Sequence, residues 1–232
     1  MEYVTGDWHL RHGNILKHSK RLPFLSDYER KVVLSGDSRA IQDLKISRES
    51  SDRMNDAIVD NTNKVVGEND HLILLGDVVW STRDSSMTDT LKTWRYYREK
   101  IRCRNVSLVW GNHDPKQDTG ARREIAKLFQ GAYDLYNLKM DGKKAVCSHY
   151  AMAIWDGRHH GSYHFYGHSH SNSEVWLDSI MPGRWSMDCG IDNAYKILGQ
   201  YRPFSWTELV DIFSKRPGFG LLGGRDYHHD EA

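Results

Sequence analysis

The chain has 232 residues, of which 39% are hydrophobic and 27% are charged, and its formal net charge is +1 at pH 7. This composition is typical of an ordinary globular protein. The near-zero charge argues against a strongly basic nucleic-acid-binding surface, although it does not exclude a local basic cleft. No apolar stretch approaches the roughly 20 residues that a membrane span requires, so we expect no membrane segment.

The N-terminus and the cysteines indicate the compartment. The opening MEYVTGDWH has no basic region followed by an apolar core, so we expect no secretory signal. Cys103, Cys147 and Cys189 are odd in number and lack C-x-x-C spacing, which favours buried thiols in a reducing compartment over a disulfide framework. We therefore expect a cytoplasmic protein. Its oligomeric state is left open by the sequence.

The first predicted elements are a strand, an irregular segment and a helix. EYVTGD predicts a short strand that runs into a glycine turn. Residues 10–50 are mostly polar, with weak apolar clusters, and predict an irregular insertion with room for a short helix or hairpin. Apolar residues at helical spacing then predict a helix that begins near Ser50 and ends at Gly67.

From residue 70 onward, strands and helices alternate. HLILLGD and VSLVWGNHD each predict a buried strand that ends in glycine and polar residues. Helical spacing follows the first over residues 85–101 and the second over ARREIAKLFQG. KKAVCSHY and SYHFYGHSH predict two further strands, and residues 171–212 look like closing strands and turns before a polar, frayed C-terminus. This order predicts one layered α/β domain over residues 1–232, with ligands at the carboxyl ends of its strands.

Polar side chains that can bind metals follow the predicted strands at five places. The groups are Asp7-Trp8-His9, Gly76-Asp77, Gly111-Asn112-His113-Asp114, His149 and Gly167-His168-Ser169-His170. In DxH and HxH, the outer two side chains share a face if the backbone is extended. Carboxylate, imidazole and amide oxygen suit divalent ions such as Mn, Fe, Ni or Zn. Seven of these side chains already exceed what one tetrahedral ion uses, so the pattern indicates two ions with a bridging carboxylate.

Each group alone has an ordinary structural explanation. Asp7 and Asn112 could cap turns, and His149 could be a core histidine with its hydrogen bonds satisfied. A single GD or HxH is also weak evidence for a metal site. The occurrence of all five groups at successive strand ends favours the two-metal interpretation.

The series DxH, GD, GNHD, H and GHxH, from Asp7 to His170, resembles the calcineurin-like metallophosphoesterase superfamily. The later segment RWSMDCGIDNAYKILGQYRPFSWTEL is similar to the tail of its small single-domain members of bacterial or phage type. The resemblance implies a four-layer α/β/β/α sandwich of two mixed sheets around a binuclear metal centre. It also implies hydrolysis of a phosphate ester by a hydroxide that bridges the two metals.

The resemblance further implies a role for each site residue. One metal would be bound by Asp7, His9 and His170, the other by Asn112, His149 and His168, and both by Asp77. His113 would contact the substrate phosphate and donate a proton to the leaving group. Asp114 would either orient the His113 imidazole or cap the following turn, and both alternatives stay open.

Two departures from the family pattern concern the substrate. Many protein phosphatases of the family read GDxxDRG, whereas this chain reads GDVVWSTR and has Trp80 in place of the second Asp. Trp80 would form an aromatic wall for the substrate or cover the edge of the core. The insertion would overhang the site or, as we favour, form a surface elaboration. Its cationic residues are Arg11, His12, His18, Lys20 and Arg21, among which His12 is a candidate substrate contact.

The leading hypothesis is a phosphodiesterase that uses two divalent ions, manganese being favoured, to hydrolyse a small phosphodiester or nucleotide. A phosphomonoesterase or protein phosphatase is the first alternative. A nuclease is the second, and a nucleic-acid partner is not favoured because the charge is near zero. A non-enzymatic scaffold is less favoured still, since every implied ligand is present.

Overall fold

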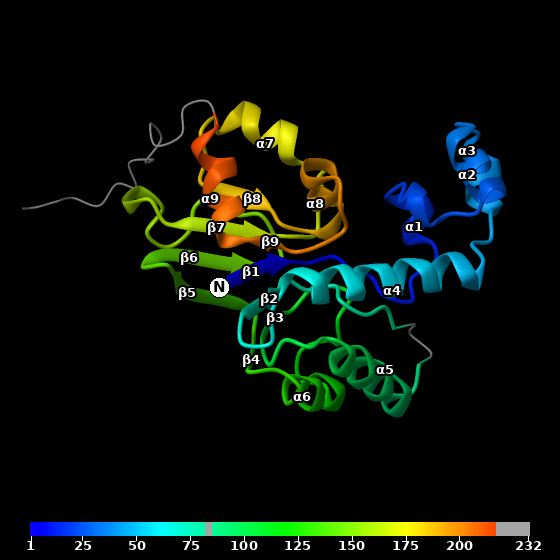
Figure 1. Ribbon diagram of the computed structural model, residues 1–232, viewed down its shortest axis with the longest axis horizontal. Coiled ribbons are helices and arrows are strands. Elements are labelled where there is room, and N and C mark those ends of the chain that lie inside the picture. Colours follow the sequence, from blue (N-terminus) through cyan, green and yellow to red (C-terminus); the bar gives the residue numbers. More distant parts are fainter. Residues whose placement is uncertain (82–84, 217–232) are drawn as a thin grey trace, which may run out of the picture.

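The computed structural model describes residues 1–81 and 85–216 (Figure 1). Two mixed sheets lie at its centre, with the strand orders β4-β3-β2-β1-β9 and β5-β6-β7-β8. β9 runs antiparallel to β1 and β5 runs antiparallel to β6, whereas the other neighbours are parallel. The first sheet contains β1 (Glu2–Thr5), β2 (His71–Leu74), β3 (Asn105–Val109), β4 (Gly131–Tyr133) and β9 (Phe204–Ser205). The second contains β5 (Leu135–Met140), β6 (Lys143–Ser148), β7 (Tyr163–Tyr166) and β8 (Ser186–Asp188).

The residues of β2 and its C-terminal neighbour show how the layers pack. Leu72 and Leu74 belong to the hydrophobic cluster beneath the helices, whereas Ile73 and Leu75 belong to the cluster shared with the second sheet. Successive side chains of a strand point to opposite faces, so a strand covered on both faces needs an unbroken apolar run. The sequence HLILL therefore specifies the inner position of this strand.

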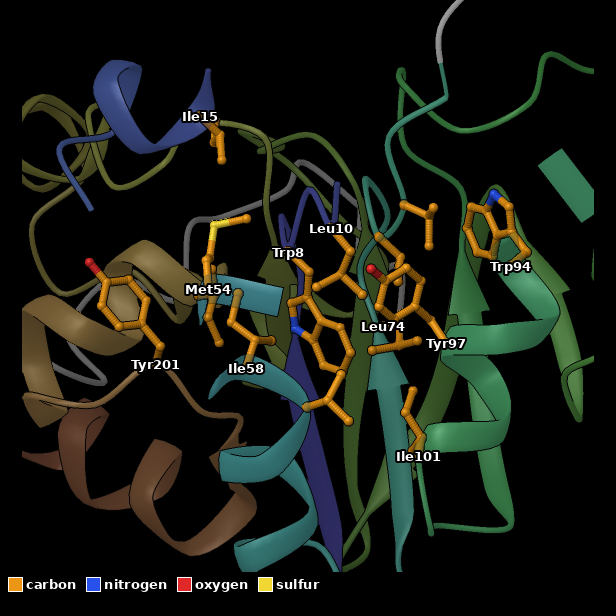
Figure 2. Close-up of a cluster of buried hydrophobic side chains, with 14 of the residues drawn as sticks. Trp8, Leu10, Ile15, Met54, Ile58, Leu74, Trp94, Tyr97, Ile101 and Tyr201 are labelled. Atoms are coloured by element: carbon orange, nitrogen blue, oxygen red, sulfur yellow. The ribbon is translucent and has the colours of Figure 1, made fainter. Parts of the chain in front are cut away.

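Three helices flank the first sheet and lie where the sequence predicts them. They are α4 (Arg48–Val65), α5 (Met87–Lys100) and α6 (Gly120–Ala126). Ser47 and Ser86 cap the first two by accepting a hydrogen bond from a backbone N–H one turn onward. The apolar faces of α4 and α5 close on Trp8 and its neighbours in the core (Figure 2). The helical periodicity and the caps together explain these elements.

The segment 10–50 is more regular than predicted. It holds α1 (Ile15–His18), a 3-10 helix (Leu22–Phe24), α2 (Asp27–Leu34) and α3 (Ser38–Asp43) before α4 begins. Ser26 and Glu29 form a capping box at the start of α2. Ile15, Leu16, Phe24 and Val33 are buried in the core, so scattered apolar residues suffice to fix these short helices. The prediction of an irregular segment is wrong in this respect.

The prediction of strands and turns over residues 171–212 is also wrong for most of that range. It contains α7 (Glu174–Ile180), α8 (Ile191–Leu198) and α9 (Trp206–Ser214), together with β8 and β9. A capping box formed by Ser205 and Glu208 begins α9, and Gly199 ends α8 with a φ of 70°. These end signals were present in the sequence. β4 and β5 are further strands that the sequence analysis did not predict.

The remaining expectations concern the thiols, the membrane and the tail. Cys103, Cys147 and Cys189 are free and buried, as predicted. In the part of the chain that the structure describes, no helix combines the length and the apolar character that crossing a membrane takes. The end of the predicted C-terminal tail, residues 217–232, lies outside the described residues.

Candidate metal centre

The predicted ligands meet at the carboxyl ends of β1, β2, β3, β6 and β7. Most of them have a backbone conformation that non-glycine residues rarely adopt. The φ angles are 54° at Asp7, 50° at His9, 51° at Asp77, 68° at His168 and 49° at His170. The extended backbone assumed for DxH and HxH is therefore wrong, and left-handed turns direct these side chains instead. Such conformations are strained and persist where surrounding contacts fix them.

Two glycines allow the loops after β2 and β3 to approach each other. Gly76 has a φ of 89°, as a glycine turn requires. Gly111 instead allows a close approach to Asp77, because a Cβ at position 111 would lie 2.2 Å from Oδ1 of Asp77. A Cβ on Gly76 would lie 2.4 Å from the backbone N of Gly111. The Gly-Asp and Gly-Asn pairs thus keep Asp77 and the loop after β3 in contact.

The structure brings the predicted ligands together as two groups joined by Asp77. Ligand atoms of Asp7, His9 and His170 lie within 4.8 Å of one another, and so do those of Asp77, His149 and His168. Oδ1 of Asn112 lies 2.8 Å from Nε2 of His149 and 2.8 Å from Nδ1 of His168. Oδ2 of Asp77 lies 3.4 Å from Nε2 of His149 and 3.7 Å from Nε2 of His9. Asp77 therefore occupies the position between the groups that a bridging carboxylate requires.

Unpartnered polar atoms test whether these residues fit metal ions. Both carboxylate oxygens of Asp7 and both ring nitrogens of His9 are buried and have no hydrogen-bond partner among the described residues. An uncompensated buried polar group costs on the order of 2–7 kcal/mol, so such atoms are rare in a stable fold. A carboxylate and an imidazole side by side are a donor set that divalent transition metals accept. The residues present fit a metal ion.

The electrostatics of the two groups differ. Burial raises the pKa of Asp7 to about 7 and lowers the pKa of His9 to about 2, which favours the uncharged form of each. Burial acts in the same directions on Asp77 and His149. Their mutual hydrogen bond and opposite charges outweigh it, and bring the pKa of Asp77 to about 2 and that of His149 to about 9. The protein itself thus compensates charge around Asp77 but leaves Asp7 without a counter-charge of comparable strength.

A family model described as calcineurin-like phosphoesterase matches residues 3–222. The chain belongs to this family. Membership supports a metal-dependent phosphoester hydrolase, and the two Asp/His groups provide places for its metals. A crystal structure of a protein of unknown function from Aquifex aeolicus is similar with a TM-score of 0.56 and 20% identity, over 91% of this chain and 98% of that one. This likeness shows the fold alone. No curated protein matches the chain.

A buried arginine and its carboxylate partner support one side of the phosphoesterase centre. Arg21 is fully buried and donates hydrogen bonds of 2.8 Å to each carboxylate oxygen of Asp192. It also donates to the backbone carbonyls of Asp7, at 2.7 Å, and Trp8, at 2.8 Å. Asp192 in turn lies 2.6 Å from Nδ1 of His170. A carboxylate on one ring nitrogen orients a ligating imidazole and raises its basicity at the other.

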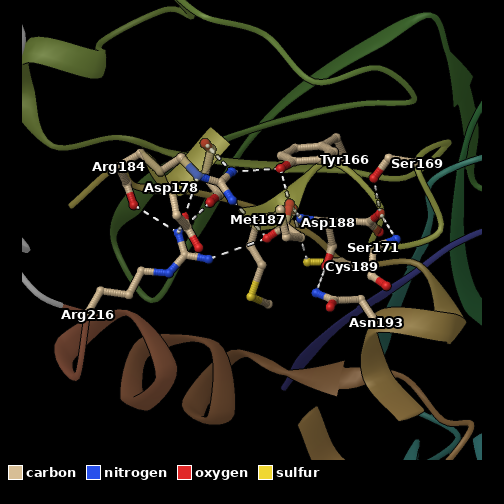
Figure 3. Close-up of polar contacts among 12 residues, drawn as sticks. Tyr166, Ser169, Ser171, Asp178, Arg184, Met187, Asp188, Cys189, Asn193 and Arg216 are labelled. Carbon is tan, nitrogen blue, oxygen red and sulfur yellow. Dashed lines mark hydrogen bonds and ion pairs between the residues drawn. The ribbon is translucent and has the colours of Figure 1, made fainter. Parts of the chain in front are cut away.

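The turn that carries His168 and His170 is held by Asp188 at the end of β8 (Figure 3). Oδ2 of Asp188 accepts hydrogen bonds from the Ser169 hydroxyl at 2.5 Å and from the backbone N–H of Ser171 at 2.9 Å. Beneath it, Arg184 binds Glu174 at 2.8 Å and donates to the Tyr166 hydroxyl at 2.6 Å. This network ties α7 to β7 and β8. Asp188 thus connects the turn of the phosphoesterase motif GHSH to this network, because its backbone N–H donates to Glu174.

The contacts of Asp114 match neither alternative, because among the described residues its carboxylate bonds to the preceding loops and to neither the following turn nor the His113 imidazole. Its carboxylate accepts hydrogen bonds from the backbone N–H groups of Gly111 at 2.8 Å, Asp77 at 3.0 Å and Val78 at 3.3 Å. These bonds join the loops after β2 and β3. The side chain is also buried, whereas His113 is exposed. Asp114 thus fixes the loop that carries the ligand candidate Asn112.

The three predicted substrate contacts lie together at the mouth of the centre. The ring of Trp80 stacks on His12 with centroids 3.8 Å apart and planes 12° apart. The centroid of His113 lies 4.8 Å from that of Trp80 and 5.5 Å from that of His9. Burial lowers the pKa of His12 to about 4, so this imidazole is neutral near pH 7. Trp80, His12 and His113 together form an aromatic surface beside the candidate ligand His9.

The segment 10–50 reaches the phosphoesterase centre. Besides Arg21 and His12, Ser19 contacts it, with its hydroxyl 3.3 Å from Nδ1 of His170. The favoured interpretation of this segment as a surface elaboration is therefore wrong for its first part. Sequence reasoning missed the roles of Arg21 and Asp192, although Arg21 stood in the cationic cluster and Asp192 in the tail segment with G-x-D. Their partnership spans 171 positions, which no local pattern reveals.

Proposed function

We propose that the protein is a two-metal phosphodiesterase that hydrolyses a small phosphodiester or nucleotide. Asp7, His9 and His170 would hold one ion, Asn112, His149 and His168 the other, and Asp77 both. The observation that carries this proposal is the buried, unpartnered set of Asp7 and His9 atoms next to a carboxylate that lies between two ligand groups. Manganese is our first choice of metal, and Fe, Ni or Zn would suit the same donors. When bound, two divalent ions supply Lewis-acid stabilisation of phosphoryl charge and a water of lowered pKa.

Residues of the chain itself would bind the ester and donate a proton to its leaving oxygen. The backbone N–H of His113 donates to Oδ1 of Asp77 at 2.8 Å, which holds His113 at the mouth of the centre. Its exposed imidazole is placed to contact a phosphoryl oxygen and to donate a proton to the leaving oxygen. Trp80 and His12 would bind a ring of the substrate by stacking.

Two features favour a diester over a monoester or a nucleic acid. Trp80 takes the place of the second Asp of the protein-phosphatase pattern, and its stacked ring suits a substrate with an organic group on each side of the phosphate. The formal net charge of +1 supports a small substrate over a nucleic acid, and Arg48 and Lys100, which line a groove with Arg11, are paired with Asp52 and Asp56. The three buried thiols support the cytoplasm as the compartment.

Hydrolysis of two chromogenic substrates tests this function. Purified protein is assayed with bis(4-nitrophenyl) phosphate and with 4-nitrophenyl phosphate, with added Mn²⁺ and then with excess chelator. Chelator-sensitive turnover that favours the diester is the expected result. A preference for the monoester would replace the proposal by a phosphomonoesterase. Bound metal without turnover of either ester would favour a scaffold, and steeply salt-dependent binding and cleavage of DNA or RNA would favour a nuclease.

A further inference from the structure

A small polar cavity opens beside His170. Its volume is about 280 Å³. Its lining includes His18, Ser19 and Lys20 of the segment 10–50, together with Asn172, Tyr195 and Tyr201. The contact of 3.3 Å between the Ser19 hydroxyl and Nδ1 of His170 places the cavity directly against the candidate metal ligand. Apart from His170 and its partner Asp192, the residues that line the cavity have no role assigned above in the proposed hydrolysis.

The backbone around Lys20 is fixed by anchors on both sides. Ser19 before it contacts His170, and Arg21 after it is buried against Asp192. The carbonyl of Lys20 accepts a hydrogen bond of 2.7 Å from the N–H of Leu22. Lys20 itself has a φ of 50°, a conformation that costs a non-glycine residue energy. Strained conformations of this kind are kept where surrounding structure imposes them, commonly at functional sites.

The charge that the cavity offers to a ligand is positive. Lys20 is exposed and forms no ion pair or side-chain hydrogen bond within the described residues. The one carboxylate in the wall, Asp192, is already engaged by Arg21 and His170. An anion in the cavity would therefore meet an unused ammonium group and no uncompensated negative charge. His18, Ser19 and Asn172 add side chains that can donate hydrogen bonds.

We propose that this cavity binds a second phosphate group of the substrate, one that is not hydrolysed. This inference rests on the proposed phosphodiesterase and narrows its substrate to a nucleotide, or a similar ester, with an additional phosphate. The volume of about 280 Å³ lies just below the range for small-molecule sites, about 300–1,000 Å³, and suits a single phosphate group. Lys20 supplies the charge for its recognition, and a lysine binds phosphate as a point charge.

A matched pair of substrates tests the cavity without changing the bond that is broken. Thymidine 5′-(4-nitrophenyl phosphate) and its 3′-phosphorylated form share the scissile diester and the leaving group, and differ only by the second phosphate. Values of kcat and KM are measured for both with the full-length, Mn²⁺-loaded protein and its variants. Lys20→Met keeps the length of the side chain and removes its charge, Lys20→Arg restores a charge, and Lys45→Met is the control on an exposed lysine of the same segment.

We expect the wild type to prefer the 3′-phosphorylated substrate through a lower KM. Lys20→Met should reduce the ratio of the two kcat/KM values about tenfold, Lys20→Arg should recover most of it, and Lys45→Met should leave it unchanged. A ratio that stays the same in Lys20→Met, or a wild type without preference, would overturn the inference while leaving the phosphodiesterase intact. Failure of the wild type to hydrolyse either ester would instead count against the proposed function, and with it this inference.

Discussion

Oδ2 of Asp192 lies 2.6 Å from Nδ1 of His170, and both oxygens of the same carboxylate bind Arg21. The contact occupies one ring nitrogen of His170, so the other is the one that could bind a metal ion. Arg21 and Asp192 come from opposite ends of the chain, so this side of the centre forms only when the fold is complete. Burial by itself would raise the pKa of Asp192, but the charge of Arg21 holds it well below its usual value. The carboxylate therefore stays ionised as a partner of His170.

Replacing Asp192 tests this support. Asp192→Asn keeps the shape of the side chain but removes its charge, and we expect the affinity for Mn²⁺ to fall about 10- to 100-fold. Equilibrium dialysis of the purified protein measures the affinity directly, without any assay of turnover. Asp211→Asn, on the exposed side of α9, is the matched control and should bind Mn²⁺ as the wild type does. Equal affinity in Asp192→Asn and wild type would mean that the contact has no effect on metal binding.

Arg21→Ala should lower the free energy of unfolding more than a conservative substitution of Arg21 would. It leaves Asp192 buried without its cation and empties a fully buried position, so the free energy of unfolding should fall by about 3–5 kcal/mol. Urea unfolding of the metal-free protein measures this loss. Arg39→Ala, an exposed arginine of α3, is the control. A loss below about 1 kcal/mol would show that the buried pair contributes little to the fold.

Asp77→Asn tests the proposed bridging role of this carboxylate. The amide keeps an oxygen to accept the bond from the His113 N–H, so we expect the fold to persist. Turnover should fall at least about 1,000-fold, because one of the two ligand groups loses its only carboxylate. Steady-state kinetics and the metal content of the purified variant are measured together, with circular dichroism as the check on folding. Asp43→Asn, at the exposed end of α3, serves as the control. Full activity in Asp77→Asn would contradict the mechanism.

Trp80 provides a test of ring recognition. Trp80→Ala removes the surface that stacks on His12, and we expect KM for an aromatic or nucleotide diester to rise about fivefold to tenfold. Trp80→Phe retains a ring and should recover part of the loss, whereas kcat should change little in either variant. If kcat falls and KM does not, Trp80 positions His113 and does not bind the substrate.

We expect Glu29 to make the free energy of unfolding depend on pH. Burial alone would raise its pKa, but hydrogen bonds from the backbone N–H groups of Ser47 and Ser26 and from the Ser50 hydroxyl lower it to about 2 from 4.5. Because the pKa of Glu29 is lower in the folded than in the unfolded chain, the ionised carboxylate stabilises the fold at pH values above the unfolded pKa. This contribution disappears as the pH falls from about 4.5 toward 2. At pH 7 it is on the order of 3 kcal/mol.

Comparison with Glu29→Gln isolates this contribution from other carboxyl groups. Urea unfolding at several pH values between 3 and 7 should show a large advantage of the wild type at pH 7 that shrinks toward pH 3. Glu49→Gln, an exposed residue in the first turn of α4, is the control. A difference between wild type and Glu29→Gln that is independent of pH would assign the effect to packing instead of charge.

The sequence predicted the parts of the fold that local patterns encode. Apolar runs such as HLILL predict buried parallel strands, and caps with helical spacing predict α4 and α5. The ligand candidates were found because each follows such a strand. The helices of residues 171–212 were missed because they are short and one apolar turn resembles a buried strand. The left-handed backbone at Asp7 and His9 could not be predicted, since only glycine signals that conformation reliably in a sequence.

The connection between β1 and β2 has a consequence for variants of this protein. Ser19, Lys20 and Arg21 are consecutive, and they touch a candidate ligand, line the adjoining cavity and hold the carbonyls of Asp7 and Trp8. Because the three residues share one turn, a substitution at any of them that shifts the backbone also affects the contacts of the other two. We therefore expect a different connection here to change substrate preference and metal affinity together, whereas the candidate ligands that follow the other strands would keep their places.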